Sequence, residues 1–361
     1  MSDPLFTSCK LGALSLRNRI IMSPMTRDRA GPGDVPNDIM VEYYRQRAGA
    51  GMIVTEGTQP SAVGKGYWRT PGIHSQEQIA GWRRVADAVH AEDGIIVMQL
   101  MHCGRVVVTE NRGFEADVIA PSPIPCPAKV PGPDGVPLET AAPRALEASE
   151  LPALAEEFAQ AARNARESGI DGVEIHCASG YLLNQFLNIA SNTRADEYGG
   201  SPEKRARFLI EVLSAVSAAI GADRTGLRIS PGNGYNGMDT SEPEVSFAPL
   251  LAAASDLDLA YVHVVDMGEE CPETLAMLRR HFAGPIIANN MLKADSARAI
   301  FSEGNAQAVS FGRAFIANPD LPYRIANDLA LAKPRYELLY QGEAAGYIDY
   351  PASGEADSNN E

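Results

Sequence analysis

The chain has 361 residues, a length that suits either two domains of average size or one (β/α)8 barrel with insertions. Its content of 45% hydrophobic and 21% charged residues is enough to bury a large core, which excludes disorder of the whole chain. The 46 acidic residues outnumber the 31 basic ones, and the net charge of -15 argues against nucleic acid or an anionic membrane surface as a partner.

The cysteines and the first residues give information about the cellular compartment. Five cysteines are widely spaced and form no CxxC pair, so we expect reduced thiols, no disulfide framework and no zinc or iron–sulfur site. The opening MSDPLFTSCK has no basic segment followed by an apolar one, and no apolar run approaches roughly 18 residues. The sequence therefore predicts a cytoplasmic protein that does not bind membranes.

Short apolar runs of β-type composition alternate with amphipathic helical patterns along the chain. The predicted strands are 19–25, 51–57, 94–102, 172–178, 224–231, 259–266, 285–290 and 308–315. The predicted helices are 38–48, 76–91, 151–168, 202–220, 244–255, 272–281, 294–301 and one near 321–331.

Eight strand–helix repeats predict a single-domain (β/α)8 barrel with its helices outside. A doubly wound open sheet is the alternative, although no GxGxxG motif follows the first strand. The proline-rich stretch 106–150 follows the third strand, where we expect it to cap the active-site mouth, although it could also be a surface excursion without a role. We expect the barrel to occupy residues 1–350 and the small, polar, acidic stretch 351–361 to be a disordered tail.

Functional residues of such a barrel lie at the carboxyl ends of its strands. Asn289 and Asn290 end the seventh strand, and Gly312 and Arg313 end the eighth, which is where barrels often bind a phosphate. A phosphate site implies a phosphorylated substrate or a cofactor such as FMN. Arg313 could instead form a structural ion pair.

Two further pairs of residues are candidates for the active site, one for catalysis on a carbonyl group and one for binding a flavin. His176 and Tyr181 lie five residues apart across a strand-to-loop junction, so one could polarise an oxygen while the other supplies a proton. Gln99 and Arg228 lie at similar depth in the third and fifth strands and could bind the hydrogen-bonding edge of a flavin. Each of the four could also be purely structural, and no third ligand accompanies His102 and His176 to indicate a metal.

Seven segments in collinear order carry a family resemblance. They are NRIIMSPMTRDRA from Asn18, EYYRQRAGAGMIVTEGTQ from Glu42, KGYWRTPGIHSQEQIAGW from Lys65, QLMHCGR from Gln99, DGVEIHCASGYLLNQFL from Asp171, SNTRADEYGGSPEKRARF from Ser191 and FGRAFIANPDLPYR from Phe311. They resemble the old yellow enzymes, which are FMN-dependent ene reductases, and especially their bacterial N-ethylmaleimide and pentaerythritol tetranitrate reductase branch. With a final GYIDYP from Gly346, the resemblance covers nearly the whole chain.

The resemblance implies a role for each matching position. The implied FMN-binding residues are Pro24, Met25, Thr26, Gly57, Gln99, Arg228, Asn289, Asn290, Gly312 and Arg313. His176 and Ser179 match the pair that holds the activating oxygen of the substrate, and Tyr181 matches the residue that protonates Cα. Tyr67, Met101 and Tyr340 match residues that line the substrate cavity.

Three positions depart from the family pattern. Ser179 stands where Asn or His is usual, so its bond to the substrate oxygen could become water-mediated or be lost. Met101 stands where this branch often has Trp, which gives a softer cavity wall. Asn289 replaces a usual Gly in the phosphate loop.

The expected activity is therefore the reduction of C=C bonds activated by carbonyl, imide or nitro groups, in two half-reactions at one tightly but non-covalently bound FMN. NADPH or NADH serves as the reductant, no metal takes part, and the partners are small α,β-unsaturated carbonyl or nitro compounds. We expect a monomer or a homodimer. The alternatives are a nitrate-ester or nitro reductase, a redox-neutral isomerase, and a weakly active flavin-binding protein on the same barrel.

Overall fold

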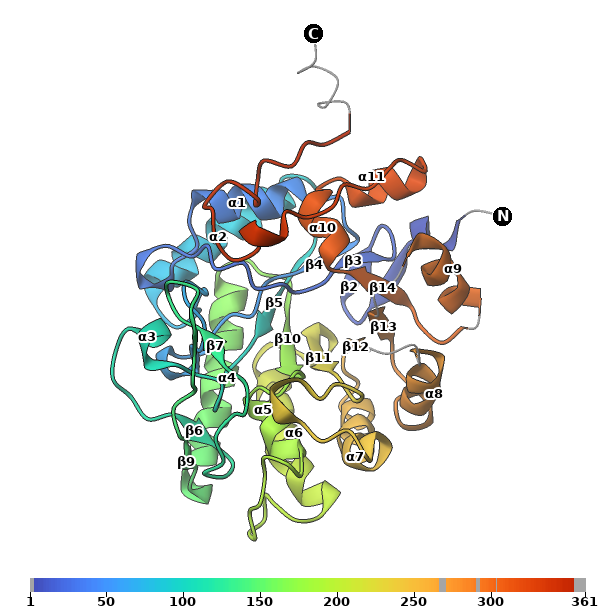
Figure 1. The fold of residues 1–361 in the computed structure, drawn as a ribbon. Coiled ribbons are helices and arrows are strands. Elements are labelled where there is room, and N and C mark those ends of the chain that lie inside the picture. Colours follow the sequence, from blue (N-terminus) through green and yellow to red (C-terminus); the bar gives the residue numbers. More distant parts are fainter. Residues whose placement is uncertain (1–2, 266–270, 290–292, 303, 354–361) are drawn as a thin grey trace.

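The computed structural model describes residues 3–265, 271–289, 293–302 and 304–353, and its centre is a closed barrel of eight parallel strands (Figure 1). Around the barrel the strands are β3 (Ile20–Met22), β4 (Met52–Val54), β5 (Ile96–Leu100), β10 (Gly172–Cys177), β11 (Thr225–Ile229), β12 (Tyr261–Val265), β13 (Ile286–Asn289) and β14 (Ala308–Phe311). β14 pairs with β3 and closes the ring. Each predicted strand contains one of these eight, so the predicted barrel is confirmed.

Helices surround the barrel on its outside (Figure 1). They are α1 (Asp38–Gln46), α2 (Gln76–His90), α4 (Leu151–Glu167), α5 (Leu182–Leu187), α6 (Pro202–Ile220), α7 (Pro243–Asp256), α8 (Cys271–His281), α9 (Ala294–Ser302), α10 (Arg313–Ala317) and α11 (Leu321–Ala326). Side-chain caps fix several starts: Asn37 caps α1, Ser75 forms a capping box with Gln78 on α2, and Ser201 caps α6. These helices therefore begin within a residue of their predicted starts.

Two predicted ends lie four or five residues too far along the chain, and α5 and α10 among the helices around the barrel were not predicted. The eighth strand stops at Phe311 rather than 315, because the backbone turns at Gly312 and α10 begins at Arg313. α11 ends at Ala326 rather than 331, because Asp328 adopts a left-handed φ of 52° and the Leu329 amide bonds back to the Arg324 carbonyl. α5 was missed because a six-residue helix buried on all sides has no amphipathic period.

A hairpin closes the amino-terminal end of the barrel. β1 (Cys9–Leu11) pairs antiparallel with β2 (Leu14–Leu16), and their leucines pack on inward side chains of the barrel strands. The turn needs Gly12, which has a φ of +56° and whose added Cβ would lie 2.2 Å from the Asp223 carbonyl oxygen. Access to the interior is therefore left to the opposite end.

The proline-rich stretch folds into small pieces beside that open end (Figure 1). They are α3 (Thr109–Arg112), β6 (Ile119–Ala120), β7 (Val130–Pro131), β8 (Pro137–Leu138), β9 (Arg144–Ala145) and η4 (Ala148–Glu150). β7 and β8 form a hairpin, and a separate apolar cluster around Val106, Val118 and Val130 packs it beside Tyr67 and Tyr181. The tip of this hairpin thus lies next to the predicted catalytic residues.

The carboxy-terminal segment crosses the open end and is held by buried arginines. Arg27 donates to the carbonyls of Leu339 and Gly346, and Arg47 donates to those of Phe315 and Ile316. Tyr347 stacks on Tyr43 with ring centroids 4.0 Å apart. The remaining short 3-10 helices are η1 (Pro4–Phe6), η2 (Pro32–Asp34), η3 (Ala62–Gly64), η5 (Ala222–Arg224), η6 (Tyr235–Gly237) and η7 (Tyr336–Leu338). Of the predicted tail, residues 354–361 lie outside the described residues.

Candidate active site

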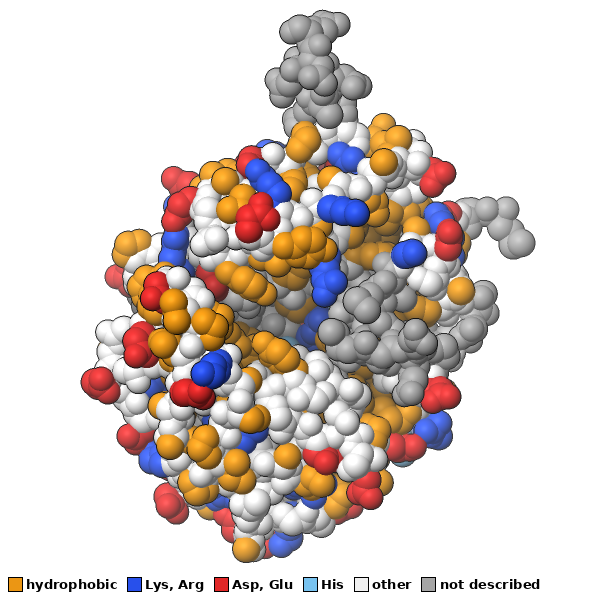
Figure 2. All heavy atoms as spheres, in the orientation of Figure 1, with side chains coloured by type: hydrophobic (Ala, Val, Ile, Leu, Met, Phe, Trp, Pro, Cys, Tyr) orange, Lys and Arg blue, Asp and Glu red, His pale blue; other side chains and the backbone are white. Residues whose placement is uncertain are grey.

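Three connected hollows open at the carboxyl ends of the barrel strands. We call them the inner chamber, of about 310 Å³ around His176; the side chamber, of about 260 Å³ around Arg313; and the outer chamber, of about 680 Å³ around Tyr67. Thr26 lines all three, so they form one continuous site. Figure 2 shows this hollow near the middle of the face, bordered by hydrophobic side chains with basic ones along one side.

Nearly all the predicted site residues meet in these hollows. The inner chamber is lined by Pro24, Thr26, Gly57, Gln99, Met101, His176, Ser179, Tyr181 and Arg228 among others. The side chamber adds Met25, Asn289, Gly312, Arg313 and Tyr340, and the outer chamber adds Tyr67. Asn290 lies outside the described residues. An added Cβ at Gly57 would lie 2.5 Å from Met101 Cε, so a larger residue there would require the Met101 side chain to move.

The floor of the inner chamber is a hydrogen-bonded network of charged and polar side chains. Strand register aligns Gln99 with Glu174, and Arg228 with His176 on one side and His263 on the other. Both Glu174 oxygens are used: one accepts from Gln99 Nε2 and the other lies 2.8 Å from His263 Nδ1. Because parallel strands place these residues side by side, the network is a direct result of barrel topology.

The charges in this network stabilise one another. Burial alone would raise the pKa of Glu174, but His263 and Arg228 beside it hold that pKa down at about 2. Burial lowers the pKa of Arg228 to about 10 and that of His263 to about 4, so Arg228 is charged and His263 neutral at pH 7. The carboxylate can only accept, so His263 carries its proton on Nδ1, and its Nε2 accepts from the Ser310 hydroxyl at 2.7 Å.

This network orients two donors toward the chambers. Arg228 donates to Asn289 Oδ1 at 3.2 Å, and this bond lies where the inner chamber meets the side chamber. Among the described residues, none hydrogen-bonds or ion-pairs with the guanidinium of Arg313, so that cation is free for an anion in the side chamber. The Gln99 amide and the Arg228 guanidinium at the floor fit the pyrimidine edge of FMN, and the Arg313 guanidinium to one side fits its phosphate.

The catalytic candidates lie on the wall of the inner chamber. The rings of His176 and Tyr181 have centroids 5.3 Å apart, and the hydroxyls of Tyr181 and Tyr67 lie 2.9 Å from each other. Burial and the nearby Arg228 charge lower the pKa of His176 to about 3, so its imidazole is neutral. Burial raises the pKa of Tyr181 and of Tyr67, so both phenols keep their protons. His176 Nδ1 is buried without a partner among the described residues.

Ser179 has an unusual backbone. Its φ of 57° is left-handed, a conformation that Asn adopts more readily than Ser. The backbone is held there on both sides, since its amide donates to Ser230 Oγ and its carbonyl accepts from Asn236 Nδ2. Ser179, with its short side chain, lines the inner chamber.

Sequence reasoning missed several residues of the site. Glu174 and His263 carry a signal that could have found them, because a charged residue inside an otherwise apolar barrel strand must face a polar interior. Asp28, Trp68, Tyr235 and Glu337 line the outer chamber without any such signal, since they lie on loops that only the fold brings together.

The sequence matches the NADH:flavin oxidoreductase / NADH oxidase family over residues 4–332. The chain belongs to this family. The old yellow enzyme resemblance is thus confirmed, and among its relatives is chanoclavine-I aldehyde reductase of Penicillium roqueforti, 40% identical over 97% of each chain. The 12-oxophytodienoate reductase 2 of Arabidopsis thaliana is 37% identical over 97% of this chain and 96% of that one.

Solved structures of old yellow enzymes share the fold. The old yellow enzyme homologue from Zymomonas mobilis superimposes with a TM-score of 0.92 and 39% identity, over 96% of this chain and 99% of that one. Morphinone reductase in complex with tetrahydroNAD superimposes with a TM-score of 0.91 and 41% identity, over 96% of this chain and 97% of that one. The protein is thus an FMN-dependent ene reductase of the old yellow enzyme family that uses a nicotinamide reductant and acts on small molecules.

No helix of this old yellow enzyme is, among the described residues, long and apolar enough to cross a membrane. No group of three or more His, Cys, Asp or Glu side chains among them could hold a metal ion.

Proposed function

We propose that this enzyme reduces C=C bonds conjugated to a carbonyl, imide or nitro group, with His176 and Ser179 holding the activating oxygen and Tyr181 supplying the proton. The observation that carries the proposal is the convergence of a neutral imidazole and a protonated phenol on one chamber. The floor of that chamber bears the Gln99 and Arg228 donors.

The chain's own residues would hold FMN in place. Gln99 and Arg228 would bind the pyrimidine edge of the flavin, with Pro24, Met25, Thr26 and Gly57 beside the ring. Asn289, Asn290, Gly312 and Arg313 would hold the phosphate. When bound, FMN supplies hydride to the alkene after taking it from NADPH or NADH.

His176 and Ser179 would act on the oxygen of the activating group. A neutral imidazole has one N–H to donate, and Arg228 below it disfavours the imidazolium. As the alkene is reduced, negative charge develops on the substrate oxygen, so donors that bind the charged form more tightly than the ground state accelerate the step. The side chain of Ser179 is shorter than that of the usual Asn, so His176 would carry most of this stabilisation.

Tyr181 would donate its proton to Cα. Its hydroxyl bonds to that of Tyr67, which lines the outer chamber and is itself protonated. A proton given up by Tyr181 could be replaced through Tyr67 from solvent in the outer chamber. Tyr67, Met101 and Tyr340 would shape the space for the rest of the substrate.

The test is a comparison of Tyr181→Phe with the wild-type enzyme in stopped flow. The purified protein should show a flavin spectrum and release FMN on denaturation. Tyr181→Phe should slow alkene reduction by about 10²–10⁴-fold while the rate of flavin reduction by NADPH or NADH stays near normal. Equal slowing of both half-reactions would refute the proton-donor role, and nitrite release or product formation without net NADPH use would favour the alternative activities.

We also propose that the enzyme is cytoplasmic, works as a monomer or homodimer and binds no nucleic acid, with one catalytic domain over residues 1–350. The net charge of -15 supports the absence of nucleic-acid partners. Light scattering after size exclusion would measure the oligomeric state.

A further inference from the structure

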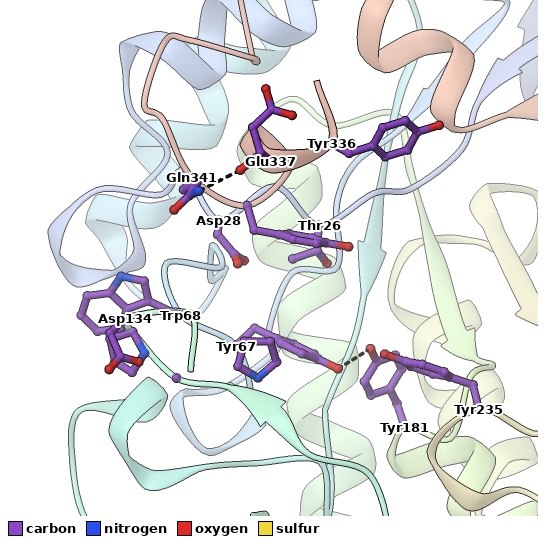
Figure 3. A pocket seen from close by; sticks show the side chains of 15 residues that line it. Thr26, Asp28, Tyr67, Trp68, Asp134, Tyr181, Tyr235, Tyr336, Glu337 and Gln341 are labelled. Atoms are coloured by element: carbon purple, nitrogen blue, oxygen red, sulfur yellow. Dashed lines mark hydrogen bonds between the residues drawn. The ribbon is translucent and has the colours of Figure 1, made fainter. Parts of the chain in front are cut away.

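The outer chamber differs in chemistry from the rest of the site (Figure 3). Six aromatic side chains line it: Tyr67, Trp68, Tyr181, Tyr235, Tyr336 and Tyr340. Three acidic residues, Asp28, Asp134 and Glu337, line it as well, and no Lys or Arg is among the described residues that do. At about 680 Å³ it has room for a substrate group well beyond the reacting alkene.

Asp28 is the acidic residue built most deeply into this chamber. Its Oδ1 is buried and has no hydrogen-bond partner in the described part of the chain. Figure 3 shows its carboxyl directed toward the space that Tyr67 and Trp68 also face. A buried carboxyl oxygen without a partner is unfavourable, so this oxygen is set up to meet a ligand group.

The basic residues near Asp28 are occupied elsewhere. Arg27 donates to the carbonyls of Leu339 and Gly346, Arg29 donates to those of Leu338 and Glu343, and Arg69 pairs with the Glu343 carboxylate. Glu56, whose negative charge raises the pKa of Asp28, is buried. No side chain from these neighbouring elements therefore donates to the free oxygen of Asp28.

A carboxyl group among aromatic faces, in a chamber that no Lys or Arg of the described residues lines, is the environment that binds organic cations. Lys65 lies over the Trp68 ring, 5.8 Å from its centroid, but its ammonium group is paired with Asp34. Aromatic rings attract an ammonium group over their faces, with most effect in partly desolvated sites. A carboxylate adds a charge-assisted bond. An anionic or phosphate-bearing group would meet three acidic residues and no cation in the same chamber.

We propose that the outer chamber binds a protonated or quaternary amine carried by the substrate, and that Asp28 is the residue that determines this specificity. The proposal rests on the proposed function, since it names the class of activated alkene that the same site prefers: one with an ammonium group some distance from the reacting bond.

The ionisation of Asp28 adds a signature that can be measured. Burial, together with the Glu56 charge, raises the pKa of Asp28 to about 8, although Arg29, Arg69 and Arg27 act in the opposite direction. The carboxyl is therefore mostly protonated at pH 6 and mostly ionised at pH 9. A cation favours the ionised form, so its binding should tighten by about tenfold or more across that range.

The first test compares two substrates of the same shape. 4-(Trimethylammonio)cinnamaldehyde and 4-tert-butylcinnamaldehyde differ by one charge. At pH 9, where Asp28 is mostly ionised, the cation should have the higher kcat/KM in the wild-type enzyme, and in Asp28→Asn the ratio of the two should fall by about ten- to a hundredfold. Asp87→Asn removes an exposed negative charge from α2 that lines none of the three chambers, and should leave the ratio within about threefold of wild type.

The second test measures binding without catalysis. Calorimetric titration of the holoenzyme with phenyltrimethylammonium should give a Kd that tightens from pH 6 to pH 9, and Asp28→Asn should remove most of that pH dependence. The rest comes from Glu56, whose pKa burial raises to about 7. Equal kcat/KM values for the two aldehydes at pH 9 in the wild-type enzyme, or a Kd independent of pH, would overturn the role of Asp28. If neither aldehyde is reduced, the proposed function fails, and the titration still decides whether the chamber binds cations.

Discussion

Replacing Glu174 by Gln should destabilise the protein because Glu174 is the only carboxylate of the network under the inner chamber. Both of its oxygens accept bonds, from Gln99 and from His263, and it offsets the buried charge of Arg228. A glutamine puts an NH2 group in place of one acceptor and leaves Arg228 without a negative charge nearby. Removing one partner of a buried charge pair costs about 3–5 kcal/mol of unfolding free energy.

The pKa of Glu174 gives an independent value for the same quantity. A carboxyl whose pKa falls from 4.5 in the unfolded chain to about 2 in the folded one contributes roughly 3 kcal/mol at neutral pH. Because the folded pKa is the lower one, this stability is present above pH 4.5 and is lost as the pH falls toward 2.

Urea unfolding followed by circular dichroism would measure the effect at pH 7 and at lower pH. The free energy of unfolding of Glu174→Gln should lie about 3 kcal/mol below that of the wild type at pH 7, and the two should converge below pH 4.5. Glu115→Gln, at an exposed position in the proline-rich stretch, should change stability by less than about 0.5 kcal/mol. A Glu174→Gln protein as stable as wild type at pH 7 would show that the carboxylate does not offset the Arg228 charge.

Three further substitutions test other parts of the site. Tyr67→Phe removes the hydroxyl 2.9 Å from that of Tyr181, so alkene reduction should slow by up to about tenfold in stopped flow, and no change would exclude proton supply through Tyr67. Ser179→Asn places a longer donor at a left-handed position, so phenols should bind several-fold more tightly by their charge-transfer band; unchanged affinity would mean that the side chain does not reach the ligand. Arg313→Ala should weaken FMN binding by about tenfold or more by ultrafiltration, whereas exposed Arg207→Ala should not.

The barrel could be predicted from the sequence because its strands are short apolar runs separated by helices of clear amphipathic period. The helix starts could be predicted where a capping residue such as Ser75 or Ser201 marks them. The end of α11 could not, because it depends on Asp328 adopting a left-handed conformation that its residue type permits but does not require.

The inner and side chambers could be predicted because their residues follow barrel strands, whose ends must meet. The outer chamber could not. Glu337 and Tyr340 line the same chamber as Tyr67. They do so because Arg27 and Arg29 bind backbone carbonyls of the carboxy-terminal segment that crosses the open end of the barrel. Bonds from a side chain to the backbone of a distant segment leave no periodic pattern in either segment. Asp28 therefore looks like an ordinary loop residue in the sequence, and the fold gives it its surroundings.

The hairpin at the amino-terminal end of the barrel has a consequence for kinetics. Leu11, Leu14 and Leu16 fill that end with apolar side chains, and the three chambers that the described residues form all open at the other end, where reductant and alkene enter and leave. The reductant must depart before the alkene can enter, and each excludes the other while it is inside. The reductant should therefore inhibit when it binds the enzyme form that reacts with the alkene, and the alkene should inhibit when it binds the form that reacts with the reductant. Turnover should fall at high concentrations of either compound.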